Sequence, residues 1–144
     1  MTLVDHKKGI LILILIFGLI GCTNVGPNTT YDIATTSFNY DPTYSDYMLK
    51  LNGQEIGGGF GGAMSTNSIK TGSQVITWKD AKTGKPHSAK NQVIITKEQL
   101  KGKKYLAAHI YPDDTVEITT SNNWPTPTDK GLKWREKIKN NGAK

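Results

Sequence analysis

Residues capable of chemistry are few in this chain and lie far apart. The chain contains one cysteine, Cys22, and three histidines, of which His87 and His109 lie beyond the first 30 residues. A nucleophilic serine needs a base beside it, and the G-x-S-x-G motif that presents such a serine does not occur. Two histidines without further cysteines make a poor zinc site. We therefore identify no catalytic residue, no metal ligand and no cofactor, and we expect no enzyme activity.

The surroundings of the histidines and of the closest acidic residues favour structural roles. His87 ends a polar, glycine-containing segment and is expected at the surface, whereas His109 lies within an expected strand and should pack or pair across a sheet. Asp113, Asp114 and Glu117 could supply oxygen ligands to calcium, but a turn with acidic corners is far commoner.

Cys22 ends the most apolar stretch of the chain. Two lysines precede the apolar run 10–20, and Gly21 stands before the cysteine. A positive segment, an apolar segment and a small residue form the layout of a secretory signal. Eleven residues in a helix cover about 16 Å, roughly half the hydrocarbon core of a bilayer. We predict that residues 1–21 are a signal peptide and not a spanning helix.

The four residues from Leu19 to Cys22 resemble the bacterial lipobox. This resemblance implies cleavage between Gly21 and Cys22 and acylation of Cys22, which then binds the lipid bilayer. Two or three acyl chains hold a protein stably, because each buried methylene contributes about 0.8 kcal/mol. The next residue is Thr23 and not the Asp associated with inner-membrane retention, so we expect an outer-membrane lipoprotein facing the periplasm. An ordinary signal that ends near a cysteine is the alternative.

Composition limits the domain and its partners. Without the signal peptide, 16 basic and 11 acidic residues remain, a formal charge of +5. The basic residues are lysines apart from Arg135, and nucleic-acid sites favour arginine, so we expect no nucleic-acid partner. A single cysteine allows no internal disulfide, so the fold must rest on its hydrophobic core. We expect a lipidated tether over residues 22–30, one domain over 31–126 and a basic tail or short helix over 127–144.

Strand signals dominate the domain. Short runs of Thr, Val, Ile and Tyr alternate with Gly, Asn, Asp and Pro. The expected strands are residues 47–51 and 54–56 around an Asn52-Gly53 turn, 74–78, 92–96, and a hairpin of 105–111 with 115–120. Thr96 begins a capping box, and Asp129 is expected to cap a short C-terminal helix. We predict a mainly all-β fold, an antiparallel β-sandwich or partial barrel of about five to seven strands.

The glycine-rich segment 57–62 is the most unusual stretch of the domain. It lacks the Lys-Ser/Thr of a phosphate-binding loop and the strand-to-helix context of a dinucleotide site. It is either a flexible connection between strands or a loop that presents side chains to a partner. In the second case we expect Gly58, Phe60 and Met64 to contact a protein partner. Trp124, which stands between asparagines and a proline, is difficult to bury and is a further candidate contact.

Several segments occur together in one order. They are the lipobox, the polar tether, the hairpin at 47–53, the glycine-rich segment, a V-x-x-W strand at 75–78, an L-x-x-H-x-x-P-D-x-x-V-E segment at 106–117 and a Trp-Pro-x-Pro segment at 124–127. In this order the chain resembles a family of small lipoproteins found beside type VI secretion phospholipase effectors. The likeness covers most of the chain after the signal peptide.

Some members of that family are regarded as immunity proteins. The resemblance implies a membrane-anchored protein that binds and neutralises a phospholipase toxin without catalytic residues of its own. A basic surface would speed its encounter with an acidic toxin. A structural lipoprotein that docks on an envelope complex is the alternative function.

Overall fold

The computed structural model describes residues 29–43 and 47–142, which form ten short strands and two helices. The strands are β1 (Thr30–Asn39), β2 (Lys50–Leu51), β3 (Gln54–Glu55), β4 (Ser65–Lys70), β5 (Gly72–Gln74), β6 (Ile76–Lys79), β7 (Pro86–Ser88), β8 (Val93–Ile95), β9 (Tyr105–Ile110) and β10 (Val116–Ser121); the helices are α2 (Lys97–Leu100) and α3 (Asp129–Gly142). The mainly β class with a short C-terminal helix is confirmed. The predicted signal peptide, Gly21 and Cys22 lie outside the described residues.

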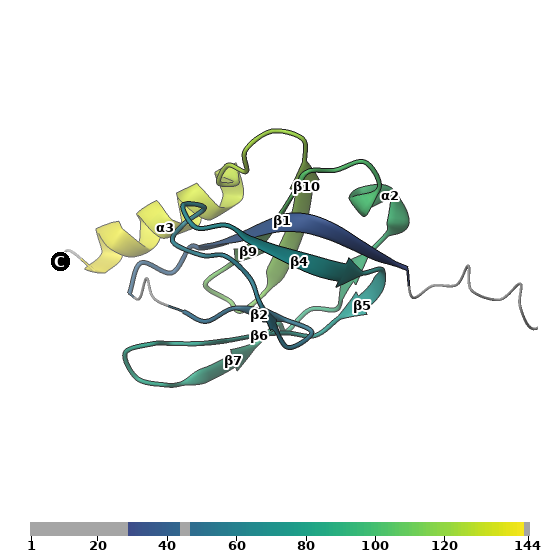
Figure 1. Ribbon diagram of the computed structural model, residues 1–144. Coiled ribbons are helices and arrows are strands. Elements are labelled where there is room, and N and C mark those ends of the chain that lie inside the picture. Colours follow the sequence, from purple (N-terminus) through teal and green to yellow (C-terminus); the bar gives the residue numbers. More distant parts are fainter. Residues whose placement is uncertain (1–28, 44–46, 143–144) are drawn as a thin grey trace, which may run out of the picture.

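Three sheets make up the β structure, and none closes into a barrel (Figure 1). One has the order β10-β9-β1-β4, the second the order β3-β2-β6-β7, and the third pairs β5 with β8. Neighbouring strands are antiparallel, as expected, apart from β1 and β9, which run parallel from Ala34 opposite Tyr105 to Asn39 opposite Ile110. Parallel strands need a long crossover, and residues 40–104 supply it.

Strand β1 was not individually predicted, although it lies inside its sheet. Its sequence, TYDIATTSFN, lacks an alternating apolar pattern because both faces of its second half are buried. Small hydroxyl side chains fill this part, and each finds a hydrogen-bond acceptor. Thr35 Oγ1 donates to Asn67 Oδ1 (2.6 Å), Thr36 Oγ1 to the Ala63 carbonyl (2.8 Å) and Ser37 Oγ to the Gly57 carbonyl (2.6 Å).

The two predicted hairpins are present. Asn52 (φ 51°) and Gly53 (φ 82°) turn β2 into β3, and β9 pairs with β10 over six residues. The prediction of one strand over residues 74–78 was wrong. At Val75, whose side chain is 67% exposed, the chain leaves β5 and enters β6 in another sheet. The Val75 N–H binds Asn52 Oδ1 (2.7 Å) and its carbonyl accepts the Asn52 N–H (2.7 Å), so the β2–β3 turn fixes this break.

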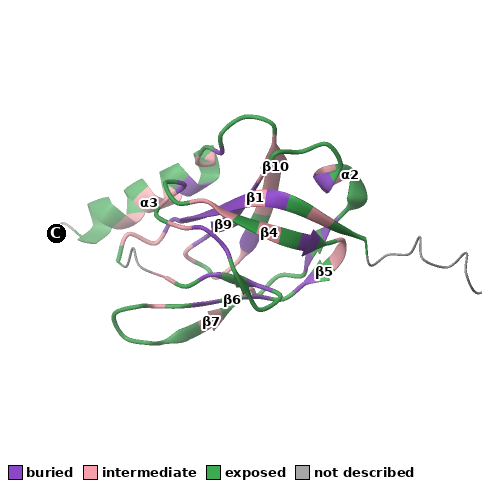
Figure 2. Cartoon of the chain, in the orientation of Figure 1, coloured by how far each residue is buried: buried purple, intermediate pink, exposed green. Residues whose placement is uncertain are grey.

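Two hydrophobic cores lie on the two faces of the β10-β9-β1-β4 sheet. Figure 2 shows buried residues in β1 of this sheet. On β9, Leu106, Ala108 and Ile110 face the main core, whereas Ala107 on β9 and Tyr111 just after it belong to the second. The main core is aliphatic apart from Trp78, and it joins all three sheets. The second core consists of buried Phe38, Tyr40, Ala107 and Tyr111, with Phe60 and Trp134 packed against them.

The helices begin at hydroxyl caps. Thr96 forms the predicted capping box with Gln99 at the start of α2. The expectation that Asp129 caps α3 was wrong, because the cap is one residue earlier: Thr128 Oγ1 accepts the Gly131 N–H (3.1 Å). Asp129 instead occupies the first turn. Gly131, the one buried residue of α3, lies against the Tyr40 ring, so the first turns of the helix dock on the second core.

Candidate partner-binding surface

Five rings stack on the face of the β10-β9-β1-β4 sheet against which α3 packs. They come in the order Phe38, His109, Tyr40, Tyr111 and Trp134, with successive centroids 5.1, 5.9, 5.4 and 6.1 Å apart and interplanar angles of 5° to 17°. Phe38 lies on β1 and His109 on β9, Tyr40 and Tyr111 directly follow these two strands, and Trp134 lies on α3. Stacked rings at these separations attract one another beyond their buried area. The stack therefore fixes α3 to the sheet.

His109 is completely buried in this stack. Tyr40 Oη lies 2.8 Å from its Nδ1, Thr119 Oγ1 lies 2.8 Å from its Nε2, and the Thr128 N–H donates to Tyr40 Oη (2.8 Å). Because Tyr40 Oη already accepts a hydrogen bond, we assign its proton to His109 Nδ1 and the imidazole proton to Nε2. Burial lowers the pKa of His109 to about 4, although the negative charge of Glu117 acts in the opposite direction and raises it in part. The expectation that His109 packs within the sheet is confirmed.

Tyr111 joins the sheet to the start of α3. Its hydroxyl donates to Glu117 Oε2 (2.5 Å) and lies 3.0 Å from Thr128 Oγ1. Burial and the Glu117 carboxylate raise the pKa of Tyr111 far above its usual value, so the phenol stays protonated. Glu117 is thus engaged on the outer face of the sheet. It does not form a cation site with Asp113 and Asp114, and Asp113 instead accepts hydrogen bonds from Thr115 (2.7 and 3.1 Å).

The glycine-rich loop, residues 57–62, packs along the edge of β1. A Cβ on Gly57 would lie 2.7 Å from the Thr35 carbonyl oxygen, and one on Gly61 would lie 2.4 Å from the Phe38 ring. The Gly61 N–H also donates to the Ser37 carbonyl (3.0 Å). Glycine is required here because the backbone approaches β1 too closely for a side chain.

Three of the predicted partner contacts belong to this loop or follow it directly. Phe60 is half-buried: its ring meets Phe38 and Tyr40 edge to face, at 5.2 and 5.6 Å, and the Arg135 guanidinium lies 4.5 Å from its centroid. Gly58 lies beside the Tyr47 ring, and Met64 is half-buried. Phe60 therefore belongs largely to the second core, which leaves the loop backbone and Met64 as the accessible part.

Trp124 lies elsewhere. It follows β10, at the other edge of the sheet from the glycine-rich loop, and is 57% exposed with its ring 5.7 Å from that of Tyr105. The structure therefore does not unite the four predicted partner contacts in one surface. Sequence patterns could not show that Trp124 and the glycine-rich loop lie apart, because the order of the strands decides which segments lie at each edge of the sheet.

His87 has contacts that sequence analysis did not identify. Its ring stacks on buried Trp78, at 5.5 Å and 3°, and its Nδ1 lies 3.5 Å from Asp114 Oδ2. The His87 side chain is only 14% exposed, so the expectation of a surface-exposed histidine was wrong. No group of three His, Cys, Asp or Glu side chains placed to hold a metal occurs in residues 29–43 and 47–142.

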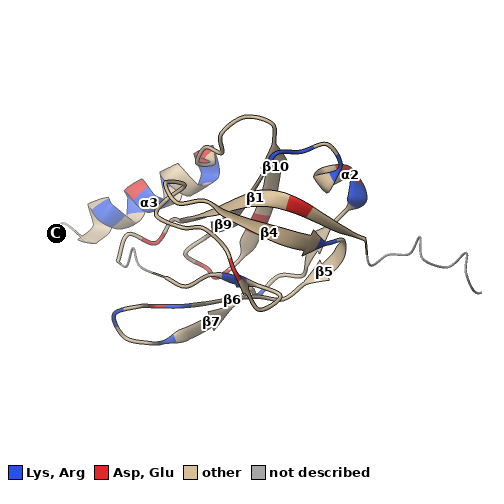
Figure 3. Ribbon diagram, in the orientation of Figure 1, with Lys and Arg blue, Asp and Glu red and all other residues tan. Residues whose placement is uncertain are grey.

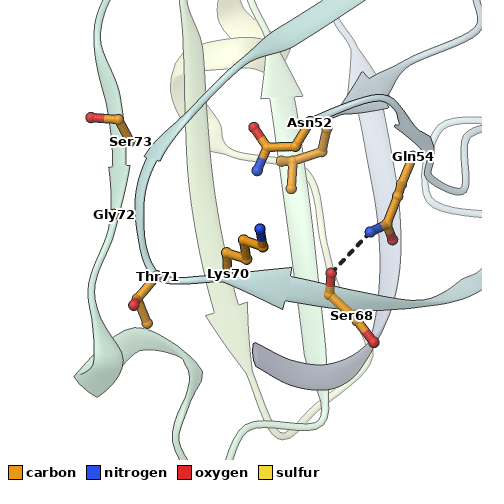
Figure 4. A pocket seen from close by; sticks show the side chains of 8 residues that line it. Asn52, Gln54, Ser68, Lys70, Thr71, Gly72 and Ser73 are labelled. Carbon is orange, nitrogen blue, oxygen red and sulfur yellow. Dashed lines mark hydrogen bonds between the residues drawn. The ribbon is translucent and has the colours of Figure 1, made fainter. Parts of the chain in front are cut away.

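Several open concave sites occur at the surface of the described residues. One, of about 540 Å³, lies between the β2–β3 turn and the β4–β5 turn, and its lining is mainly polar (Figure 4). Asn52, Gln54 and Lys70 project into it, and Gln54 Nε2 donates to the Ser68 carbonyl (3.3 Å). Another, of about 450 Å³, is lined in part by Met48, Trp78 and His87.

Comparison with protein-family models, with curated proteins and with solved structures gave no match. Within the part of the chain that the structure describes, neither helix has the length and apolarity needed to cross a bilayer.

Proposed function

We propose that this chain is a lipid-anchored envelope protein that binds and neutralises a secreted toxin, a phospholipase effector of a type VI secretion system. The observation that carries this proposal is the lipobox at residues 19–22, which ends only eight residues before β1 begins at Thr30. An inhibitor attached to the membrane that a phospholipase attacks meets the enzyme at a high effective concentration. The resemblance of the motif order to that of the lipoproteins found beside such effectors supports this class of toxin.

The toxin-binding surface in this proposal is the end of the domain away from the tether. The glycine-rich loop is hydrogen-bonded to β1 at Ser37, seven residues after Thr30. Roughly 23 Å of strand therefore separates the loop from the tether. The loop also contacts α3 through Phe60 and Arg135. We define the distal end as the glycine-rich loop, Met64 and the exposed face of α3.

The charge of the distal end suits an acidic toxin surface. Basic residues recur along α3 (Figure 3), where Lys133, Lys137 and Lys139 are exposed and Leu132 is 44% exposed. Long-range attraction of this kind accelerates encounter and weakens as salt is added.

A rescue experiment tests the proposal. Cells that produce the cognate phospholipase effector in the periplasm should die without this chain and survive with it. Met64→Glu should abolish rescue because it places a charge at the proposed contact, whereas Val75→Glu, at a more exposed valine between β5 and β6, should rescue fully. Survival that does not depend on the chain would overturn the proposal and favour an envelope complex as the partner.

Lipidation is tested separately. Cys22→Ser should remove palmitate labelling and leave the chain unprocessed, as seen by mass. Labelling that persists in this variant would contradict the assignment of Cys22 as the acylated residue.

A further inference from the structure

A group of lysines surrounds the start of β1, where the tether enters the domain. Lys70 pairs with Thr30, and Gly72 pairs with Ile95, two residues before Lys97. On the other side of β1, the Ala34 N–H donates to the Lys104 carbonyl (3.2 Å). We define the tether-end lysines as Lys70, Lys97, Lys101, Lys103 and Lys104, all of which are exposed.

These lysines are not neutralised by the domain itself. Among the described residues, none of their ammonium groups forms an ion pair or a cation–π contact. Asp32 and Glu98 are the acidic residues on the same segments, and Asp32 accepts a hydrogen bond from the Ser68 hydroxyl. Figure 3 shows the resulting basic colouring on α2 and on the connection that follows it. Five cations against two carboxylates leave this end with positive charge that faces solvent.

An exposed aromatic residue borders the same lysines. The Lys104 N–H donates to the Ser121 carbonyl (3.3 Å) and to Asn122 Oδ1 (3.1 Å), which brings the segment after β10 beside Lys104. Trp124, 57% exposed, follows on this segment and rests on Tyr105. Tryptophan beside lysine is the pairing found where proteins meet the headgroup region of a bilayer, because the ring is apolar at one end and polar at the other.

The tether keeps this end close to the membrane. Residues 23–30 span at most about 26 Å when fully extended. The end at which β1 starts is therefore the nearest part of the domain to an acyl group on Cys22. Lysines within about 8 Å of an anionic surface are attracted to it at physiological salt.

We propose that the tether-end lysines and Trp124 bind the anionic phospholipid surface to which the chain is anchored. This inference rests on the proposed lipid anchor but not on the identity of the toxin. Docking at this end orients the domain, so that the glycine-rich loop and α3 point away from the bilayer. The anchor and the docked face then act together, each raising the local concentration of the other.

Vesicle binding of the chain from residue 22 onward, with Cys22→Ser, tests the proposal without the acyl group. This chain contains every described residue. It should sediment with vesicles that contain phosphatidylglycerol and not with vesicles of phosphatidylcholine alone. Replacing Lys97, Lys101 and Lys103 by glutamine should weaken binding about a hundredfold, from roughly fivefold per lysine.

A matched variant separates a defined face from overall charge. Lys133→Gln, Lys137→Gln and Lys139→Gln on α3 remove the same three charges at the distal end and should leave vesicle binding within a few fold of the unmodified chain. Trp124→Phe should lower binding and remove any blue shift in tryptophan emission caused by the vesicles. Circular dichroism checks that all variants are folded.

Two outcomes would overturn the proposal. One is no binding of the unmodified chain to phosphatidylglycerol vesicles, and the other is an equal loss from both lysine triples. If the tether-end lysines bound an acidic protein but the chain did not bind vesicles, the proposal would likewise be overturned. Failure of toxin rescue with vesicle binding intact would remove the proposed toxin and leave this inference standing.

Discussion

The two cores of this domain are built from different chemistry. The main core is aliphatic and joins all three sheets, whereas the second core is an aromatic stack with a buried chain of hydrogen bonds that joins one sheet to α3. Aliphatic burial is insensitive to pH and to hydrogen-bond geometry. The second core depends on both. We therefore expect the main core to hold the fold, and the second core to hold the distal end in place.

The largest effect should come from the main core. Trp78, 1% exposed, lies on β6 and stacks on the His87 ring, and Trp78→Ala should lower the free energy of unfolding by about 3–5 kcal/mol. Thermal unfolding followed by circular dichroism would measure this loss. All strands should lose protection from hydrogen exchange together, and a loss confined to α3 would contradict the division between the cores.

Acid should weaken the second core through His109. The pKa of His109 is about 4 in the folded chain and 6.5 when unfolded, so the unfolded chain binds the proton more tightly. The contribution of neutral His109 to the free energy of unfolding is fully present above pH 6.5. It is lost as the pH is lowered toward 4, by roughly 3 kcal/mol in all. Urea unfolding at several pH values would measure this dependence.

His109→Gln is the control for the pH experiment, because glutamine can keep hydrogen bonds to Tyr40 and Thr119 without titrating. The fall in stability between pH 6.5 and 4 should become shallower in this variant. An unchanged slope would show that other groups, such as the carboxylates, cause the acid sensitivity.

Gly131→Ala should loosen α3 alone. The added Cβ would lie 2.4 Å from the Tyr40 ring, so the helix must shift, at a cost of about 1–3 kcal/mol. Alanine is the better helix former, so helix propensity acts in the opposite direction. Hydrogen exchange should rise in α3 while β9 stays protected. Gly142→Ala, whose Cβ would meet nothing within 4 Å, should cause no loss.

The smallest effect concerns the helix cap. Thr128→Ala should cost about 1 kcal/mol because the Gly131 N–H loses its acceptor. Asp129→Ala should cost only a few tenths of a kcal/mol, from the favourable charge in the first turn. If urea unfolding showed the same loss of stability for Thr128→Ala and Asp129→Ala, the assignment of Thr128 as the cap would be contradicted.

The main core could be predicted from sequence better than the second. The hairpins, β8, the capping box and the extent of α3 follow from local patterns, such as Asn52-Gly53 and the alternation in β10. Strand β1 could not be predicted individually, because small polar side chains replace the usual apolar alternation where both faces are covered. The second core brings together Phe38, Phe60, His109 and Trp134, which no local pattern connects.

The same contrast explains the candidate surface. Exposure of Trp124 could be predicted from its neighbours, asparagine and proline. The position of Phe60 could not, because it follows from the close approach of Gly57 and Gly61 to β1. Sequence showed an excess of lysine, but the tether-end lysines are gathered by the register of β1 with β4 and β9 and by the pairing of β5 with β8.

The parallel pairing of β1 with β9 has a consequence for how the chain must be made. A chain that leaves a pore with its N-terminus first delivers β1 early, yet the neighbour of β1 on that side is separated from it by residues 40–104. The sheet cannot assemble until nearly three quarters of the chain has emerged. Assembly of this sheet therefore waits for β9, and a product truncated before Tyr105 would lack the strand that joins β1 to β10.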